Sequence, residues 1–360
     1  MTGSPEIGSP VTDSGATMLA ASLRAPHDMA IVELARPEPG PGEVLVRMLA
    51  NGICGSDLHF WHHGPAGPPG VLGHEMAAEI VALGPSVADA WLGQRGAVWA
   101  GNQCGVCAEC GAGLGHFCSD PPNSLGGFRP DALGGLAQFA VIEPHRLLVD
   151  DCDLDPAIVT LAEPLANAIR SLDRARASEA RHCVVLGAGP LGLAHIAVAR
   201  SMGVERIVAV EGRRRRADVA RQLGADEVLD PTTDVRGKVA EWFGVGVDLV
   251  VDCVGSQETT HLGGGLCRPG GTLLLMGICG SSVRVNTYRW IEKELTIRTS
   301  VGTGADEQRR ALELLQRGVV DGSQIVTARI GLDDVPGAFA ELDAGSDEVK
   351  IVVEHRSESA

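Results

Sequence analysis

The sequence predicts an α/β protein of two domains, a small β-rich, barrel-like domain and a domain with a doubly wound parallel sheet. The first part of the chain consists of short apolar runs separated by glycine and proline. The second half alternates apolar runs with segments of helical pattern. With 360 residues, 44% of them hydrophobic, the chain has enough material for two hydrophobic cores.

Composition and charge exclude several classes of function. The formal net charge is −16, and such a field repels nucleic acid and anionic membrane surfaces. No apolar run approaches the ~20 residues of a membrane-spanning helix. Residues 1–17 are rich in Gly, Ser, Pro and Thr and lack the pattern of a secretory signal, so we expect a disordered tail. Ten cysteines without an export signal favour metal-bound thiolates in a reducing cytoplasm.

Short strands are expected to build the first domain. Residues 31–34 and 44–47 are apolar runs on either side of a turn rich in proline and glycine at 37–42. Residues 77–83 and 98–100 have the same character. Short strands with frequent turns are typical of a barrel-like sheet.

The stretch from Cys54 to Glu75 holds side chains that suit a zinc ion. Cys54, His59, His74 and Glu75 offer a thiol, imidazoles and a carboxylate, which are ligand types of Zn²⁺. A catalytic zinc requires three protein ligands and one open position. Cys54 and His74 can supply two, and the third must come from Glu75 or from further along the chain. Scattered core side chains without a metal are the alternative.

Four further cysteines, Cys104, Cys107, Cys110 and Cys118, form a second candidate metal site. Two residues separate successive members of the first three, and a longer gap lets the chain return with the fourth. Four thiolates complete a tetrahedral zinc site and leave no position for a substrate, which indicates a structural role. Free thiols and an iron–sulfur cluster are the alternatives, since spacing alone does not exclude a cluster.

Glu163 is a further candidate residue. Asp155 and Pro156 predict the start of a helix that runs through 157–162. Pro164 is expected to interrupt this helix, and a second helix is expected at 165–172. A carboxylate at such a break can point into a cleft, whereas the alternative is an ordinary exposed helix glutamate.

The segment from 182 to 211 predicts a dinucleotide-binding unit. A buried strand at 182–186 leads into a G-x-G-x-x-G turn, a helix is expected at 191–202, and a second strand at 206–210 ends at Glu211. The glycines let the backbone approach a pyrophosphate at the helix N-terminus. Glu211 can bind the ribose hydroxyls and would repel a 2′-phosphate, which favours NAD over NADP. The predicted cofactor-binding residues are Gly187, Gly189, Pro190, Leu191, Gly192, Glu211, Arg213 and Val254.

A basic run at 213–216 follows Glu211. We expect Arg213 to lie against the adenosine end of the cofactor, whereas a solvated helix start without a ligand is the alternative for the run as a whole. The β-α alternation then continues. Strands are expected at 227–229, 247–252, 272–276, 294–298 and 349–354, and helices at 235–243, 257–267, 306–317 and 335–342.

These motifs together resemble the zinc-containing medium-chain dehydrogenase/reductase family, and within it the polyol and threonine dehydrogenase branch. The resemblance covers nearly the whole chain from Met18 onward. It implies a GroES-like catalytic domain over 18–164 and 304–360, a Rossmann domain over 165–303, and a homodimer or homotetramer. The motifs that carry it are residues 54–59, 73–75 and 163–166, the four cysteines, and residues 187–192.

The resemblance also implies roles for individual residues. Cys54, His74 and Glu163 match the ligands of a catalytic zinc, which would make the cysteine site the second zinc of each chain. Glu75 matches an acid that lies beside the metal or exchanges onto it. Asp57 matches an acid that orients the ligand imidazole.

Two neighbours of Cys54, Ser56 and His59, match the proton relay of the family. They would take the hydroxyl proton of a zinc-bound alcohol, whose carbon then passes a hydride to the nicotinamide. His62 and His63 have no clear role in the family, and we expect them in a solvated loop or in the lining of the cleft.

The implied activity is hydride transfer between NAD and a secondary alcohol of the polyol, sugar or aminocyclitol type. The low aromatic content, 3%, argues against a pocket for aromatic alcohols. A threonine dehydrogenase or an aldehyde reductase of the same fold is the alternative. A zinc-binding interaction protein without turnover is a third interpretation, against which the negative charge and the catalytic residue set argue.

Overall fold

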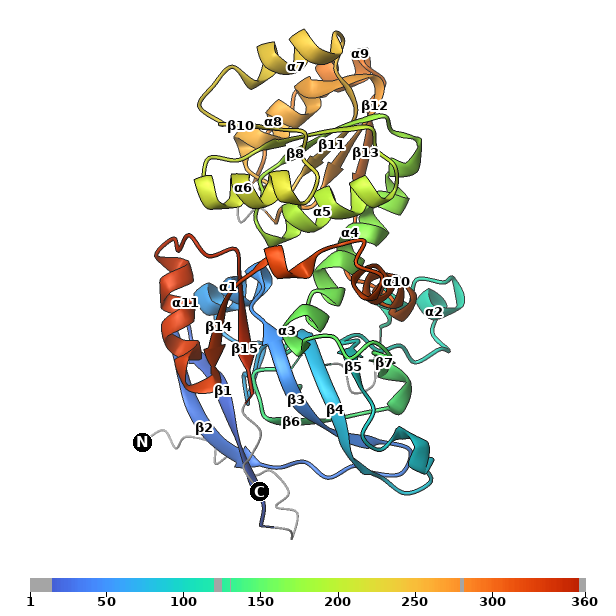
Figure 1. The fold of residues 1–360 in the computed structure, drawn as a ribbon, viewed down its shortest axis with the longest axis vertical. Helices are drawn as coiled ribbons and strands as arrows, with labels where there is room; N and C mark the ends of the chain where they lie inside the picture. The colour runs from blue at the N-terminus through green and yellow to red at the C-terminus, as the bar shows by residue number, and fades with distance from the viewer. Residues whose placement is uncertain (1–14, 120–124, 130, 279–281, 356–360) are drawn as a thin grey trace, which may run out of the picture.

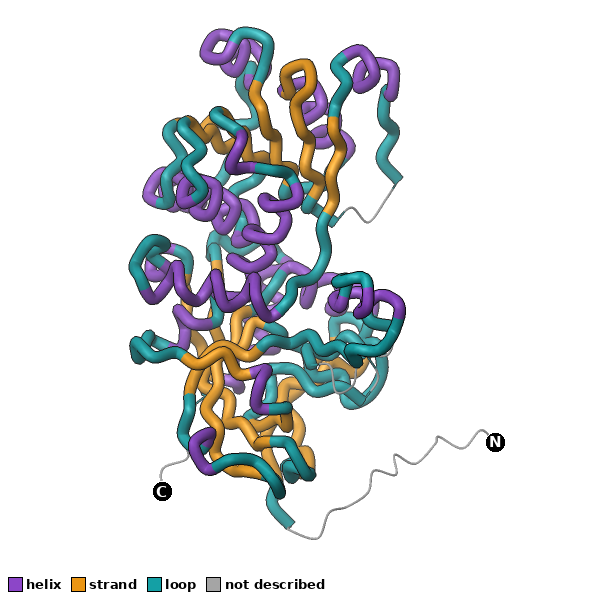
Figure 2. Tube along the Cα trace, turned by 90° about the vertical axis from the view of Figure 1, so that its right-hand side faces the viewer, coloured by secondary structure: helices purple, strands orange, loops and turns teal. Residues whose placement is uncertain are grey.

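The computed structural model describes residues 15–119, 125–129, 131–278 and 282–355. It contains two large sheets, one in the upper and one in the lower part of the molecule in Figure 1. Most of the predicted N-terminal tail, residues 1–14, lies outside the described residues. Figure 2 shows helices and strands alternating in the upper part and strands dominating the lower part.

The upper sheet is parallel and doubly wound, as predicted. Its strands follow the order β10-β9-β8-β11-β12-β13, and every neighbouring pair is parallel. The strand order therefore reverses between β8 and β11, and ligands of such sheets bind at this point. The strands are β8 (His182–Leu186), β9 (Arg206–Val210), β10 (Glu227–Leu229), β11 (Val247–Asp252), β12 (Cys267–Leu275) and β13 (Thr296–Thr299).

Helices connect these strands because a parallel pair requires a crossover. Strands β8 and β9 are almost entirely buried apolar residues, which agrees with a sheet that is covered on both faces. The helices are α5 (Pro190–Ser201), α6 (Arg214–Gln222), α7 (Val235–Phe243), α8 (Gln257–Leu266) and α9 (Thr287–Glu292).

The lower sheet has seven strands and joins the two ends of the chain. Its path is β14-β15-β3-β4-β5-β7, with β6 paired to β3. Strand β15 lies antiparallel to β3, so the C-terminal segment returns to the sheet of the N-terminal part. The boundaries 18–164, 165–303 and 304–360 stay a prediction. The strands are β3 (Val44–Gly52), β4 (Glu75–Leu83), β5 (Arg95–Val98), β6 (Phe139–Ile142), β7 (Leu147–Val149), β14 (Val326–Gly331) and β15 (Lys350–Glu354).

Further elements belong to the lower part of the molecule. They are the hairpin of β1 (Thr17–Ala25) and β2 (Asp28–Ala35) and the helices α4 (Ala162–Arg174) and α10 (Ala305–Gln316). Within the described ranges, no helix combines the length and the hydrophobicity that crossing a bilayer requires.

One helix was not predicted, and one predicted break lies elsewhere. The stretch after Cys54, for which we gave no secondary structure, forms helix α1 (Gly55–His63). The break between α3 (Pro156–Val159) and α4 lies before Ala162, and Pro164 is in the first turn of α4. Proline is tolerated there because the first N–H groups of a helix have no intrahelical partner. Glu163 is therefore part of a helix rather than of a break between two helices.

Candidate active site

Helix α1 brings Cys54 and Asp57 next to His74. The backbone N–H of Cys54 donates to Oδ2 of Asp57 at 2.9 Å. Oδ1 of the same carboxylate, which is fully buried, lies 3.4 Å from Nδ1 of His74. Nε2 of His74 is on the opposite side of the ring, 3.3 Å from Oγ of Ser56. The carboxylate of Asp57 thus orients the imidazole so that Nε2 faces the candidate metal position.

The charges around His74 favour a cation at this position. Oδ1 of Asp57 and Nδ1 of His74 are both buried and face each other at 3.4 Å, which is longer than a normal hydrogen bond. Burial lowers the pKa of His74, but the charges of Asp57 and Cys54 outweigh burial and raise that pKa well above its usual value. A metal on Nε2 would displace the proton that this environment otherwise holds on the ring.

Glu75 completes a compact group of possible ligands. One ligand atom each from Cys54, His74 and Glu75 lies within 4.8 Å of the others. A thiol, an imidazole and a carboxylate at this spacing are a suitable set for a zinc ion with an open fourth position.

A buried lysine, however, already neutralises Glu75. Nζ of Lys350 lies 2.7 Å from both carboxylate oxygens and also donates to the carbonyl of Ile53 at 3.0 Å. Burial lowers the pKa of Lys350, but the charge of Glu75 and its neighbours raises it above the usual value. Sequence reasoning missed Lys350, since its only signal is a charged residue at the start of an apolar strand.

Glu163 reaches the same region from the first turn of α4. Asn167, one turn later, donates to its Oε1 at 2.7 Å. Burial raises the pKa of Glu163 to about 6, and the charges of His74 and Glu75 act on this carboxyl in opposite directions. Glu163 therefore lies near the group, although its oxygens are outside the compact set that Glu75 completes.

The remaining histidines of α1 lie along the same helix. His59 is one turn after Ser56, and its ring stacks on that of His63 with centroids 4.3 Å apart. His63 also contacts the carbonyl of His59 through Nδ1 at 2.8 Å. His62 and His63 are exposed and end a helix, whereas we expected a solvated loop or the cleft lining.

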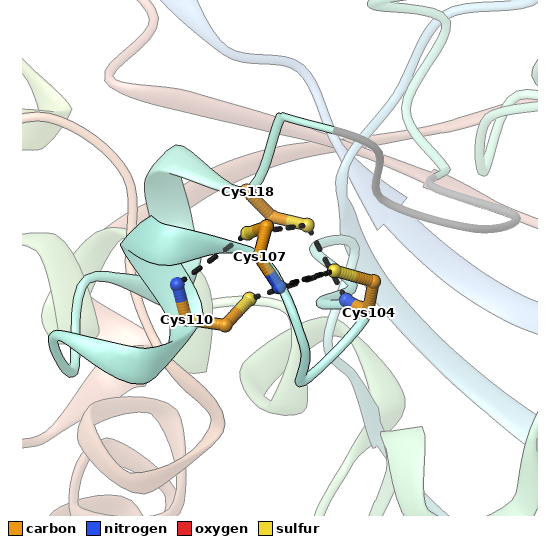
Figure 3. A group of neighbouring side chains, drawn as sticks. All are labelled: Cys104, Cys107, Cys110 and Cys118. Atoms are coloured by element: carbon orange, nitrogen blue, oxygen red, sulfur yellow. Dashed lines mark hydrogen bonds between the residues drawn. The ribbon is translucent and has the colours of Figure 1, made fainter.

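The four cysteines gather around a common centre (Figure 3). The sulfurs of Cys104 and Cys110 are 4.0 Å apart, and those of Cys107 and Cys118 are 3.9 Å apart. A tetrahedral ion with Zn–S bonds of ~2.3 Å requires sulfurs about 3.8 Å apart. The residues present therefore fit a zinc ion with little movement.

Backbone N–H groups support thiolates in this lobe. The N–H groups of Cys104, Cys107 and Cys110 donate to the sulfurs of Cys118, Cys104 and Cys107, respectively. The N–H of Cys110 lowers the pKa of the Cys107 thiol to about 6. Deprotonated sulfur is the form that binds metal.

The three glycines of the turn after β8 differ in the space around them and in their backbone conformation. Gly187 has a φ of 86°, a conformation that residues with a Cβ rarely adopt. A Cβ on Gly192 would lie 1.9 Å from the carbonyl oxygen of Gly187, so only glycine permits this packing of α5. The space above Gly189 is open, and the guanidinium of Arg216 at 3.8 Å is its one near neighbour among the described residues. The turn therefore leaves room for an anion next to the guanidinium of Arg216. From the basic run, we predicted a cofactor contact for Arg213 and not for Arg216.

Glu211 directly follows β9, and hydrogen bonds hold its carboxylate beside this turn. Its Oε2 accepts from the backbone N–H of Ala188 at 2.9 Å, and its Oε1 accepts from that of Arg213 at 2.8 Å. The guanidinium of Arg213 donates to the carbonyls of Gly345, at 3.2 Å, and Ser346. Arg213 thus connects α6 to the segment before β15, and its contact with adenosine stays a prediction.

Asp252, which we did not predict, shapes the loop after β11. Its Oδ1 accepts from the backbone N–H groups of Val254 and Gly255 at 3.1 and 2.9 Å, and its Oδ2 accepts from Thr260 at 3.1 Å. These bonds hold Val254 so close to Gly187 that a Cβ on this glycine would lie 2.6 Å from it. Val254 and Gly187 therefore meet where the strand order reverses.

Family models match both parts of the chain. A model described as alcohol dehydrogenase GroES-like domain matches residues 40–150, and one described as zinc-binding dehydrogenase matches residues 190–317. A probable D-xylulose reductase A of Aspergillus fumigatus is 32% identical over 86% of this chain and 90% of its own length. An L-threonine 3-dehydrogenase of Pyrococcus horikoshii is 33% identical over 88% of this chain and 92% of its own.

Solved structures have the same fold. A putative zinc-binding dehydrogenase of Sinorhizobium meliloti bound to NADP superposes with a TM-score of 0.86, at 29% identity, over 94% of this chain and 99% of its own. An alcohol dehydrogenase of E. coli complexed with NADH gives a TM-score of 0.85, at 25% identity, over 94% of this chain and 100% of its own.

Proposed function

The chain belongs to the zinc-containing medium-chain dehydrogenase/reductase family of oxidoreductases, and from this membership we propose that it transfers a hydride between a secondary alcohol and NAD at the site around Cys54 and His74. One observation carries the proposal. The thiol of Cys54, the oriented imidazole of His74 and the carboxylate of Glu75 lie within 4.8 Å of one another. The carboxyl of Glu163 is close enough for the charges of His74 and Glu75 to affect its pKa, and the second sheet of the chain has a dinucleotide-type glycine turn.

We assign Cys54, His74 and Glu163 as the protein ligands of a catalytic zinc. Glu75 lies closer than Glu163 to the ligand atoms of Cys54 and His74. Both of its oxygens are paired with Lys350, however, and this pairing opposes a direct bond to the metal. Among the described residues, Asn167 donates to Oε1 of Glu163, which leaves Oε2 for a cation. Glu75, whose charge Lys350 compensates, then lies beside the metal without binding it.

The four cysteines bind a second zinc with a structural role. Their sulfur spacing supports this assignment, and four thiolates leave no coordination position for a substrate. The proposed content is therefore two zinc ions per chain, only one of which has an open position.

The residues of α1 handle the proton of the reaction. Ser56 lies beside His74 and accepts the proton of the alcohol, and His59, one helical turn away, receives it and passes it to solvent. A zinc ion held by these residues would supply Lewis acidity that lowers the pKa of the alcohol, and a bound NAD would supply the hydride acceptor. Asp57 keeps the His74 ring in its orientation throughout.

NAD, rather than NADP, is the proposed cofactor. The carboxylate of Glu211 is fixed by two backbone N–H groups at the end of β9, where it binds ribose hydroxyls and repels a 2′-phosphate. Gly189 and the N-terminus of α5 would hold the pyrophosphate, Pro190, Leu191 and Val254 would line its site, and Arg213 would contact the adenosine end.

Secondary alcohols of polyol or sugar type are the proposed substrates. The similarity to a D-xylulose reductase supports this choice, and the similarity to an L-threonine 3-dehydrogenase supports L-threonine as the second candidate. The test is a panel of polyols, L-threonine and simple primary and aromatic alcohols with NAD, scored by absorbance of the reduced cofactor. Activity confined to primary or aromatic alcohols would contradict the proposal, and activity on L-threonine alone would favour the second candidate.

A homodimer or homotetramer in the cytoplasm is the proposed state of the protein. Large apolar side chains are exposed in the segments before and after edge strand β13, with exposed fractions of 77% for Ile278 after β12, 64% for Tyr288 and 71% for Ile291 in α9, and 61% for Val301 after β13. Such a patch next to a sheet edge suits a contact between copies. The described cysteines are all free thiols, which suits a reducing compartment.

A further inference from the structure

Three polar side chains from distant parts of the chain meet at the surface near the end of α1. His27 lies in the turn between β1 and β2, His62 in the last turn of α1, and Asp343 at the end of α11 (Val335–Asp343). Figure 1 places α1 beside α11. One ligand atom from each residue lies within 4.8 Å of the others. We propose that these three residues form a third zinc site, exposed to solvent and separate from the two sites described above.

The distances match the bond lengths of zinc. Nε2 of His62 is 3.2 Å from Oδ1 of Asp343, and Nδ1 of His27 is 3.6 Å from Oδ2. Ligand atoms at ~2.0–2.1 Å from a tetrahedral ion are about 3.3–3.4 Å apart. Each ring nitrogen therefore already lies close to the required separation from one oxygen of Asp343, and the three ligand atoms together lie within 4.8 Å of one another. Two imidazoles and one carboxylate are also a ligand set that binds zinc in other proteins.

Trp61 links the three elements that carry the ligands. Its indole Nε1 donates to Oδ2 of Asp343 at 3.3 Å, and its backbone carbonyl accepts from the N–H of His27 at 2.8 Å. The indole is buried and contacts the ring of Phe339 in α11, with centroids 5.7 Å apart. These contacts connect the turn, α1 and α11 before any metal binds. The protein therefore loses less conformational entropy when an ion binds.

The side chain of His27 lies beside that of His62. His27 has a φ of 58°, a left-handed conformation that histidine adopts more often than most residues other than glycine. The imidazole placed there lies 5.1 Å, between ring centroids, from that of His62 and faces the same carboxylate.

The site is open on its solvent side. The side chains of His27, His62 and Asp343 are 50%, 44% and 33% exposed, so a bound ion keeps at least one water molecule. Three protein ligands and an open position bind zinc more weakly than four thiolates in a closed lobe. We expect dissociation in the micromolar range and loss of this ion during dialysis against a weak chelator.

Zinc titration of the holoenzyme tests the site. The full-length protein is dialysed against a weak chelator, which retains the tightly held ions, and is then titrated with zinc chloride at neutral pH by calorimetry or equilibrium dialysis. The wild type is expected to bind one more zinc equivalent than the His62→Ala and Asp343→Asn variants. His63→Ala is the matched control, since His63 is exposed on the same helix but outside the cluster, and it should keep the additional equivalent.

The difference between variants isolates this site, because any vacancy in the other two sites is common to all of them. Circular dichroism spectra verify that each variant is folded. Equal zinc binding by the wild type, His62→Ala and Asp343→Asn would overturn the proposal. Loss of the additional equivalent in His63→Ala as well would also overturn it, since the ion would then bind surface histidines without selection.

Discussion

The four-cysteine lobe and the candidate active site around Cys54 and His74 both suit zinc, but they are assembled in different ways. All four thiols of the lobe come from the segment 104–118, and backbone N–H groups of the same segment donate to their sulfurs. The candidate active site takes its groups from the start of α1, the start of β4, the first turn of α4 and the start of β15.

This difference separates structural from catalytic chemistry. A closed set of four thiolates fixes a loop and leaves no position for a substrate, whereas a site built from several elements can keep one position open. The candidate active site also carries charges that need compensation away from the metal, and Lys350 supplies that compensation to Glu75. We therefore expect substitutions in the lobe to affect stability first, and substitutions in the candidate active site to affect activity or charge balance first.

The largest expected effect is that of Cys54→Ser. Loss of this ligand should reduce kcat/KM at least about a thousandfold, which is roughly 4 kcal/mol of transition-state stabilisation. The Tm should change little. Steady-state kinetics and thermal unfolding measure the two quantities.

The matched variant in the lobe is Cys107→Ser, which should show the opposite pattern. Its Tm should fall clearly because the loop loses its tetrahedral ion, whereas the fraction that stays folded should remain active. Full activity of Cys54→Ser, or an unchanged Tm in Cys107→Ser, would remove the contrast between the two sites.

Lys350→Met should give the next largest effect, on stability. The substitution leaves Glu75 as an uncompensated buried charge, and breaking a buried ion pair in this way costs roughly 3–5 kcal/mol. Urea unfolding measures the loss. In the double variant with Glu75→Gln, most of the stability should return, because no unpaired charge remains. A double variant as unstable as the single one would show that Lys350 acts by packing alone.

The protein should lose stability at acidic pH because of a buried histidine in the domain with the parallel sheet. His195 in α5 is fully buried, and its Nδ1 donates to the carbonyl of Leu191 at 2.7 Å while Nε2 lies 2.8 Å from Oγ of Ser171. Burial lowers its pKa from 6.5 to about 4. Between pH ~4 and pH ~6.5, the histidine is therefore protonated in the unfolded chain but mostly neutral in the folded protein. Stability should be complete above pH ~6.5 and fall by about 3 kcal/mol as the pH decreases to ~4.

Urea unfolding over this pH range, with His195→Gln as the control, measures the contribution. The variant keeps hydrogen-bonding groups but does not titrate, so its stability should depend less on pH. Identical pH profiles for the two proteins would exclude His195 as a source of acid sensitivity.

The smallest expected effect concerns the residue that orients His74. Asp57→Asn should weaken both zinc retention in the candidate active site and activity by roughly 10- to 100-fold, as substitutions of groups that orient metal ligands do. Chelator titration followed by metal analysis measures retention. Asp306→Asn is a suitable control because Asp306 is 92% exposed on α10, and it should behave as the wild type.

Local chemistry explains what could be predicted from the sequence. The cysteine spacing and the glycine turn lie within short segments, and the buried strands on either side of the turn are continuous apolar runs. The parallel sheet followed from the same periodicity. Helix α1 was missed because its first residues, Gly55 and Ser56, are weak helix formers and because Cys54 is an unusual N-cap.

Long-range pairing explains the rest. Lys350 meets Glu75 across 275 positions of the chain, and no periodicity in either segment indicates that contact. The same applies to Asp343 and the histidines near the end of α1. Pro164 was assigned to a helix break because its place in the first turn of α4 depends on where the preceding turn ends.

Zinc content tests the central claim most directly. After dialysis against a weak chelator, the wild type should retain about two zinc ions per chain, and His74→Ala about one, by inductively coupled plasma mass spectrometry. The remaining ion of that variant should disappear when Cys107 is also replaced by serine. A wild-type protein that holds a single zinc ion, or a His74→Ala variant that keeps both, would contradict the account.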